Sequence, residues 1–323
     1  PWNLEHSAGG SSGGAGAALA SGLLPIAQGS DGGGSIRIPS SCCGVVGLKT
    51  SRGRITNAPQ KLEEWAGCAV LGPMARTVRD AALMLDVMAG PTIGEPHWAP
   101  NPPAAFRSAA QIPPMKLRIA MIAKSALSSG DRETEAALDA AAKTFESLGH
   151  RVEPIDLDPA AMLVGTFMVI VCGATAAEKV PNPQLMDPVV RASREVGLGM
   201  TAAQYVEAVH QMHELSRQLL LRLAPYDVLI TPTLARPAPR IGSLPSAPER
   251  MQQEFGDWAP FAFPWNMTGQ PAFSLPNGFN RAGLPIGLQL VGRPADEVTL
   301  IQLAAQFEKE RPWNFKDQHP QLN

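Results

Sequence analysis

Three glycine-rich stretches follow one another near the start of the chain: GGSSGG at residues 9–14, GSDGGGSIRIP at residues 29–39 and CGVVGLKT at residues 43–50. Glycine permits backbone conformations with positive φ and leaves amide N–H groups uncovered, as an oxyanion site requires. Ser11 and Ser35 sit in the first two stretches, 24 residues apart. The pattern favours acyl transfer through a serine nucleophile. A run of small residues between the two serines, at 15–24, predicts a closely packed helix.

Elements further along the chain predict an α/β fold. A strand–helix–strand order is typical of a largely parallel or mixed sheet. We expect strands at 117–122, 151–157 and 227–230 and helices at 77–89, 131–148, 162–178, 202–223 and 299–309. Residues 90–114 are predicted to be an irregular surface excursion, and residues 236–258 a loop near the substrate.

Later motifs extend the pattern: GPMARTVRD at 72–80, DVLITPT at 227–233, PWNMTGQPA at 264–272 and LPIGLQ at 284–289. With the glycine-rich stretches they resemble the amidase signature family of serine hydrolases over essentially the whole chain. The resemblance implies an amidase-signature fold, a large mixed β-sheet covered by helices on both faces. The first four residues and the Pro–Trp near the end also resemble the branch that contains 6-aminohexanoate cyclic-dimer hydrolases.

Site roles follow from this resemblance, which implies a Ser–Ser–Lys triad. Ser35 corresponds to the nucleophile, and Ser11 to a bridging serine held by a cis peptide bond. The expected oxyanion donors are the amides of Gly32, Gly33, Gly34 and Ser35. Side chains expected to hold the shape of the turn are those of Ser12, Asp31 and Arg37. The implied reaction is two-step hydrolysis of a C–N amide bond through an acyl-enzyme.

The lysine of that triad has no match in this sequence. The resemblance places it some seventy to eighty residues before Ser11, and the chain begins only ten residues before that serine. Lys49 matches a structural lysine of the family instead. Residues 1–323 are therefore expected to form a single amidase-signature domain that lacks its N-terminal part. Without a lysine base, Ser35 is a weak nucleophile.

Three further residues are candidates for the substrate pocket: Ile38, Cys172 and Trp265. In glutamyl-tRNA amidotransferase A subunits a glutamine typically stands where this chain has Ile38, which disfavours that role and suits an uncharged, linear or cyclic amide. Cys172 lies in an apolar helix, where a buried structural thiol is the simpler interpretation. Core packing explains Trp265, and Phe263 near it, as well as a pocket wall does.

The same residues bear on other functional classes of protein. A non-catalytic fragment, or pseudoenzyme, and an amidotransferase A-type subunit both stay open. Residues 9–14 lack the Gly-Lys-Ser/Thr ending of a phosphate-binding P-loop, and Ser35 lacks the Gly-x-Ser-x-Gly context of an α/β-hydrolase. His210 and His213 lie three residues apart on a predicted helix, but no third metal ligand is evident.

The composition limits the kinds of molecule that this protein is expected to bind. The net charge is −2 and no basic block is present, so nucleic acid is not expected. Hydrophobic residues make up 45% and charged residues 17%, which suits a large buried core. We expect a small-molecule amide as partner, no cofactor, no metal and no membrane-spanning helix, with a homodimer considered. The spacing of the four cysteines fits neither a disulfide framework nor a zinc site, which favours a reducing cytoplasm.

Overall fold

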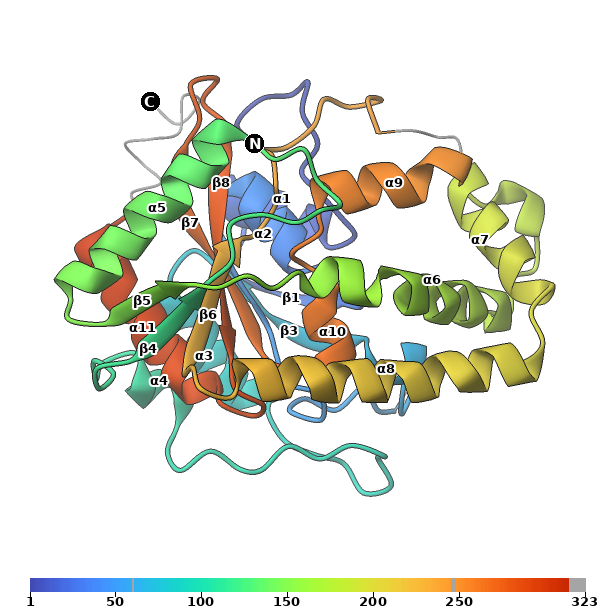
Figure 1. Cartoon of the computed structure of the whole chain (residues 1–323), viewed down its shortest axis with the longest axis horizontal. Coiled ribbons are helices and arrows are strands. Elements are labelled where there is room, and N and C mark those ends of the chain that lie inside the picture. The colour runs from blue at the N-terminus through green and yellow to red at the C-terminus, as the bar shows by residue number, and fades with distance from the viewer. Residues whose placement is uncertain (60, 245–247, 314–323) are drawn as a thin grey trace.

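One eight-stranded sheet organises the chain, in the order β1-β3-β2-β7-β8-β6-β4-β5 (Figure 1). The structure is a computed structural model and describes residues 1–59, 61–244 and 248–313. The strands are β1 (Ile26–Asp31), β2 (Val46–Lys49), β3 (Val70–Ala75), β4 (Arg118–Met121), β5 (Arg151–Pro154), β6 (Val228–Pro232), β7 (Ala272–Phe279) and β8 (Pro285–Gly292).

The sheet is mixed. From β1 through β3, β2, β7 and β8 to β6 every neighbouring pair is antiparallel, whereas β6, β4 and β5 pair in parallel. The parallel part is the one that the strand–helix–strand pattern predicted. Parallel neighbours need a long crossover connection, and the helix at 132–147 supplies it between β4 and β5.

Helices cover both faces of the sheet. The shorter ones are α1 (Gly13–Ala20), α2 (Arg37–Cys43), α3 (Val78–Met88), α4 (Phe106–Ala109), α7 (Pro188–Leu198), α9 (Pro248–Trp258) and α10 (Pro264–Thr268). The longer ones are α5 (Arg132–Ser147), α6 (Pro159–Ala177), α8 (Ala202–Leu223) and α11 (Glu297–Glu310). Two short 3-10 turns lie at Trp65–Gly67 and Pro183–Leu185.

The two faces have separate cores. Val228 and Ile230 of β6 join the cluster beneath α3, α4, α5 and α11, whereas Leu229 joins the cluster beneath α6, α8 and α10. Helices α1 and α2 lie on this second face with their own buried cluster. Successive side chains of a strand point to opposite faces, so a fully apolar strand is buried on both sides. This arrangement confirms the expected mixed sheet with helices on both faces.

Element predictions differ from the structure in two main places. Helix α7 lies in a stretch for which no element was predicted. Residues 236–258 were expected to be a loop, but residues 248–258 form α9. The prolines and polar residues of this stretch are typical of loops, so its sequence did not predict a helix. The proline of α9 stands at the first helical position, where no N–H is needed for an intrahelical hydrogen bond. Helix α8 spans residues 202–223 as expected. Within the irregular segment 90–114 lies the one-turn helix α4.

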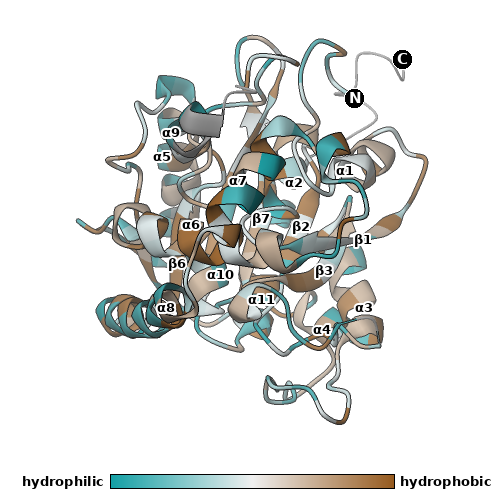
Figure 2. Ribbon diagram, turned by 90° about the vertical axis from the view of Figure 1, so that its right-hand side faces the viewer, coloured by the Kyte–Doolittle hydropathy of each residue, from teal (hydrophilic) through white to brown (hydrophobic). Residues whose placement is uncertain are grey.

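Helix α6 is unusually apolar. It is the one described helix long and apolar enough to cross a membrane, with a mean hydropathy of 2.0, and a third of it is buried. Length and composition alone do not identify a membrane span, so the expectation of no membrane-spanning helix stays a prediction. Brown, hydrophobic colours prevail along it in Figure 2. It packs against α7 and α8, and helices inside proteins have the same composition.

Candidate active site

The two glycine-rich stretches meet in the folded chain. Ser35 lies in the turn between β1 and α2, and Ser11 lies just before α1. The backbone N–H of Ser12 donates to the carbonyl oxygen of Ser35 at 3.1 Å, and Ser12 Oγ lies 3.3 Å from both the amide nitrogen and the carbonyl oxygen of Ser30. The Gly10–Ser11 peptide bond is cis, as the resemblance implied. The fold thus holds both candidate serines at one place.

The amides of the Ser35 turn fall into two groups. Gly34 has a φ of +127°, a conformation that glycine adopts at low cost, and its N–H donates to Asp31 Oδ1 at 2.8 Å. Its donor is therefore occupied, which corrects the expectation that Gly34 contributes to an oxyanion hole. Within the described residues, the N–H groups of Gly32, Gly33 and Ser35 have no hydrogen-bond acceptor. Unpaired amides in a largely buried turn are uncommon, and three together form a candidate anion site.

A buried ion pair fixes the shape of this turn. Asp31 and Arg37 are both fully buried, and Arg37 Nη2 lies 2.8 Å from Asp31 Oδ1. Asp31 Oδ2 also accepts from the amide of Ile36 at 3.2 Å and, more weakly, from that of Arg37 at 3.4 Å. One carboxylate therefore binds the amides of three turn residues. These contacts hold the backbone of the turn in one conformation.

Two more side chains complete the network. Asn266 donates to the carbonyl oxygen of Asp31 at 2.7 Å and accepts from Arg37 Nη2 at 2.6 Å. Gln289 accepts from Arg37 Nη1 at 2.8 Å. Both belong to later sequence motifs, PWNMTGQPA and LPIGLQ, for which the sequence predicted no role in the site. Their residue types alone do not indicate that they bind Arg37, because that residue lies more than 220 positions away in the sequence.

Charge is balanced inside the network. Burial alone would raise the pKa of Asp31, but the Arg37 guanidinium outweighs it and lowers the pKa to about 2. Asp31 is thus ionised across the physiological range. A carboxylate that accepts several hydrogen bonds from N–H groups is held in its charged form. The turn is consequently stabilised by a carboxylate that stays charged until the pH falls toward 2.

Lys49 is the lysine nearest in sequence to the turn, and it too is fully buried. Its Nζ donates to the carbonyl oxygen of Thr50 at 2.8 Å. Burial, with Arg37 adding to it, lowers the pKa of Lys49 to about 7. The hydrogen bond to the next residue in the chain agrees with the structural role expected for Lys49, and we assign it no proton transfer with Ser11.

Lys49 makes stability depend on pH in a predictable direction. Its folded pKa is lowered, so between pH 7 and about 10 the unfolded chain binds more protons and stability rises with pH. Lys49→Met removes this contribution, which is at most about 1.4 kcal/mol per pH unit. We expect urea unfolding from pH 7 to 10 to show a flatter profile for the variant than for the wild type. Lys124→Met, at an exposed lysine, is the control, and an identical slope for Lys49→Met contradicts the prediction.

The expected pocket residues prove to be mainly buried. Trp265 is only 1% exposed and donates to the carbonyl oxygen of Phe261 at 2.7 Å, so it is a core residue, and the expectation that it forms a pocket wall is corrected. Ile38 is buried and packs against Gly34, where an added Cβ would lie 2.8 Å from Ile38 Cδ1. Cys172 is buried in α6, with its carbonyl against Gly197 of α7. The sequence reading missed two aromatic residues that touch the turn, Trp65 and Phe167.

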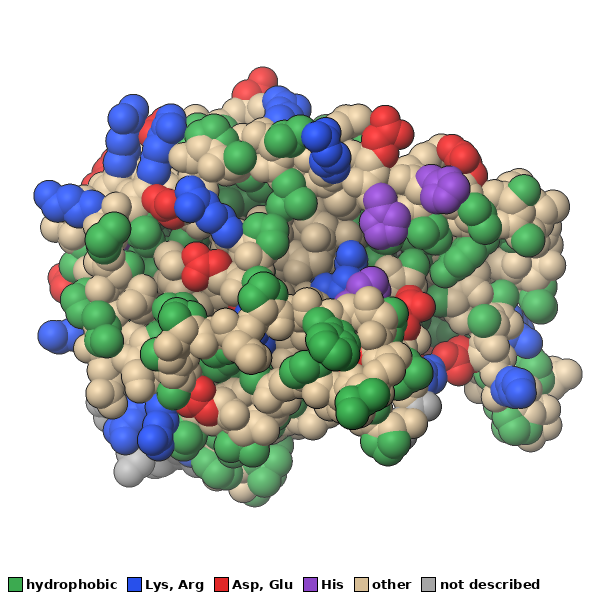
Figure 3. Space-filling view, turned by 90° about the horizontal axis from the view of Figure 1, so that it is seen from below, with side chains coloured by type: hydrophobic (Ala, Val, Ile, Leu, Met, Phe, Trp, Pro, Cys, Tyr) green, Lys and Arg blue, Asp and Glu red, His purple; other side chains and the backbone are tan. Residues whose placement is uncertain are grey.

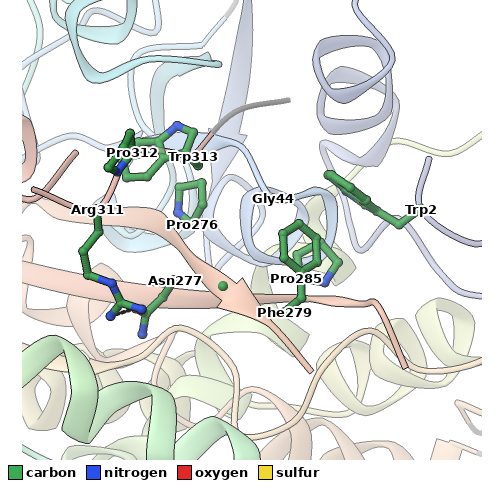
Figure 4. A pocket seen from close by; sticks show the side chains of 10 residues that line it. Trp2, Gly44, Pro276, Asn277, Phe279, Pro285, Arg311, Pro312 and Trp313 are labelled. Atoms are coloured by element: carbon green, nitrogen blue, oxygen red, sulfur yellow. Dashed lines mark hydrogen bonds between the residues drawn. The ribbon is translucent and has the colours of Figure 1, made fainter. Parts of the chain in front are cut away.

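Other features of the surface lie outside this turn. A cavity of about 230 Å³ opens beside the β7–β8 hairpin, and Figure 4 shows the side chains around it. It is lined by Trp2, Gly44, Pro276, Asn277, Gly278, Phe279, Pro285, Arg311, Pro312 and Trp313. None of these is a predicted site residue.

Histidines gather on another face. Figure 3 shows that this face is hollowed near its centre, with histidine and Lys/Arg side chains beside the hollow. Arg52 and His97 line a small pocket of about 20 Å³. His210 and His213 are both exposed on α8. Across residues 1–59, 61–244 and 248–313, no three His, Cys, Asp or Glu side chains are grouped so that they could hold a metal ion.

Comparisons with known proteins agree with this geometry. The pattern of the family named Amidase matches residues 1–301. The chain is 38% identical over 321 residues to a Synechocystis sp. protein named for the same family, covering 99% of this chain and 62% of that protein. It is 36% identical to a 6-aminohexanoate-cyclic-dimer hydrolase of Paenarthrobacter ureafaciens, covering 100% and 70%.

A solved structure is similar over the whole chain. The structure of 6-aminohexanoate cyclic dimer hydrolase complexed with substrate matches with a TM-score of 0.91 and 34% identity, and the match covers 100% of this chain and 72% of that one. The chain therefore spans about two thirds of the length of these relatives. On the family pattern, the sequence identity and the fold, this chain belongs to the amidase family.

Proposed function

We propose that the protein hydrolyses C–N amide bonds by acyl transfer through Ser35. The observation that carries this proposal is the set of unpaired amides at Gly32, Gly33 and Ser35, in the same turn as the candidate nucleophile. Donors fixed in advance where negative charge develops are typically worth about 10²–10³ in rate each. Its membership of the amidase family supports the same reaction.

The proposed reaction runs in two halves. The lysine base takes the hydroxyl proton of Ser11, Ser11 Oγ takes the proton of Ser35, and Ser35 Oγ attacks the amide carbonyl carbon. The tetrahedral oxyanion lies against the free amides. The C–N bond breaks as the proton returns through Ser11 to the leaving amine. Water then hydrolyses the acyl–Ser35 ester by the reverse proton route. Ser–Lys variants of the serine triad are known, and we keep the lysine implied before Ser11 as the base in this proposal.

The proposed substrate is an uncharged linear or cyclic amide of the 6-aminohexanoate cyclic-dimer type. Similarity to hydrolases of that dimer supports this choice. So does the apolar surrounding of the turn, where Ile38, Ala262 and Phe167 contact the glycines. The buried guanidinium at the turn, that of Arg37, is paired with Asp31. A substrate without charge fits such a surface best.

The test is covalent trapping in the full-length protein. A fluorophosphonate should add once, and peptide mass spectrometry should place the adduct on Ser35. Pre-incubation with 6-aminohexanoate cyclic dimer should slow labelling, and ninhydrin detection of released primary amine should show its hydrolysis. Ser243→Ala, at a serine whose Oγ bonds the carbonyl oxygen of Arg240, is the control. A folded protein that neither labels nor turns over amides would indicate the non-catalytic alternative.

A further inference from the structure

Trp65 lies against the first glycine of the candidate oxyanion turn. A Cβ added to Gly32 would come within 2.9 Å of Trp65 Cε3 and 3.0 Å of Cζ3. Real Cβ atoms essentially never approach other atoms this closely. The indole of Trp65 therefore occupies the space that a side chain at position 32 would need. A larger residue at position 32 would require a smaller one at position 65.

An unusual backbone aims this ring at the turn. Trp65 and Ala66 have φ values of +56° and +53°, and Gly67 follows with +76°. Left-handed conformations cost non-glycine residues about 1–3 kcal/mol each and persist only where neighbouring groups enforce them. Here Arg52 Nε donates to the carbonyl oxygen of Gly67 at 2.6 Å. The loop is thus held in place rather than free to adjust.

The loop and the turn share one anchor. The side-chain amide of Asn266 donates to the carbonyl oxygen of Cys68 at 3.0 Å and to that of Asp31 at 2.7 Å. Asn266 is fully buried. A single immobile amide therefore fixes the end of the Trp65 loop and the start of the Ser35 turn. The indole is consequently held at a set distance from the free amides.

A second aromatic ring covers the next glycine. A Cβ on Gly33 would lie 2.7 Å from Phe167 Cζ. Phe167 in turn stacks on Phe263, with ring centroids 4.7 Å apart and an interplanar angle of 23°. Trp65 is half-buried, and Phe167 is 5% exposed. Of these two rings, Trp65 is the one that still presents surface to a ligand.

We infer that Trp65 is a specificity-determining wall of the substrate site, which limits the bulk of the substrate at the carbon next to the scissile carbonyl. This inference rests on the proposed function. An oxyanion bound at the free amides places that carbon beside the turn, where the indole that contacts Gly32 limits the space. Amides with a branched carbon at this position are excluded by steric overlap.

A pair of anilides tests the inference. Trp65→Ala in the full-length protein should raise the ratio of kcat/KM for pivaloyl p-nitroanilide to that for hexanoyl p-nitroanilide at least tenfold, since one extra methylene in an apolar pocket is worth about 10–200-fold. Trp65→Phe should give an intermediate ratio. Trp98→Ala, at a tryptophan that is 62% exposed, should leave the ratio unchanged. Turnover of the hexanoyl anilide with an unchanged ratio in both Trp65 variants overturns the inference.

A second measurement does not depend on turnover. The φ of Gly32 lies outside the left-handed region, so alanine fits its backbone. Gly32→Ala should lower Tm by overlap with the indole, and the loss should shrink by at least half in the Trp65→Ala background. Equal losses in both backgrounds would show that the two positions are not coupled. If wild-type protein shows this coupling but no hydrolysis or phosphonate labelling, the proposed function fails while the packing argument holds.

Discussion

Replacing Ser35 by alanine should abolish amide hydrolysis. We expect kcat/KM to fall by about 10³-fold to 10⁶-fold, the range seen when the nucleophile of a serine hydrolase is removed. Alanine cannot form the acyl ester, whereas the free amides of the turn persist and leave some residual activity. The measurement is the steady-state rate on one anilide substrate, with fluorophosphonate labelling of the same samples.

This variant should keep its fold. Ser35 contributes its backbone carbonyl oxygen to Ser12, and alanine preserves that acceptor. We therefore expect the Tm of Ser35→Ala to match that of the Ser243→Ala control. Turnover retained within tenfold of the wild-type rate, in a variant that no longer labels, would rule out Ser35 as the nucleophile.

Breaking the buried pair should have the largest effect on stability. Arg37→Met leaves Asp31 charged and fully buried without its partner. Removing one member of such a pair costs about 3–5 kcal/mol. The residual hydrogen bonds from Gly34 and Ile36 cannot replace the guanidinium charge. We expect a reduced midpoint in urea unfolding, and slower labelling of Ser35 because the turn loses its support.

An exposed pair supplies the comparison. Arg240 and Glu5 lie 3.0 Å apart with side chains 69% and 66% exposed, and exposed ion pairs contribute about 0–1 kcal/mol. Arg240→Met should therefore shift the midpoint much less than Arg37→Met. The double variant Asp31→Asn/Arg37→Met should be more stable than Arg37→Met alone, because it removes the stranded charge. Equal losses for Arg37→Met and Arg240→Met would contradict this account.

Acid should act on the same pair. The folded pKa of Asp31 is lowered to about 2, below its ordinary value of about 3.9. Its contribution to stability is therefore present above pH 4 and is lost as the pH falls from about 4 to 2. In Asp31→Asn this part of the acid dependence should disappear.

Local sequence determined much of this protein. The glycine-rich stretches predicted the turn and its serines, and the helix expected at residues 202–223 matches α8 to its boundaries. The strand–helix–strand order predicted the α/β class. These features depend on neighbours within a few residues, whose steric and hydrogen-bonding preferences act locally. Local sequence did not predict the helix α9, because its proline and polar residues are typical of a loop.

Tertiary structure decided how the site is assembled. In the folded chain the amide of Gly34 donates to Asp31, whereas the amides of Gly32, Gly33 and Ser35 have no acceptor among the described residues. It buried Trp265 and brought Trp65 against Gly32. It also brought Asn266 and Gln289 to Arg37 from more than 220 residues away. Such contacts arise from packing between distant elements, so no local pattern encodes them. The sequence thus identified the candidate nucleophile, and the tertiary structure determined which groups surround it.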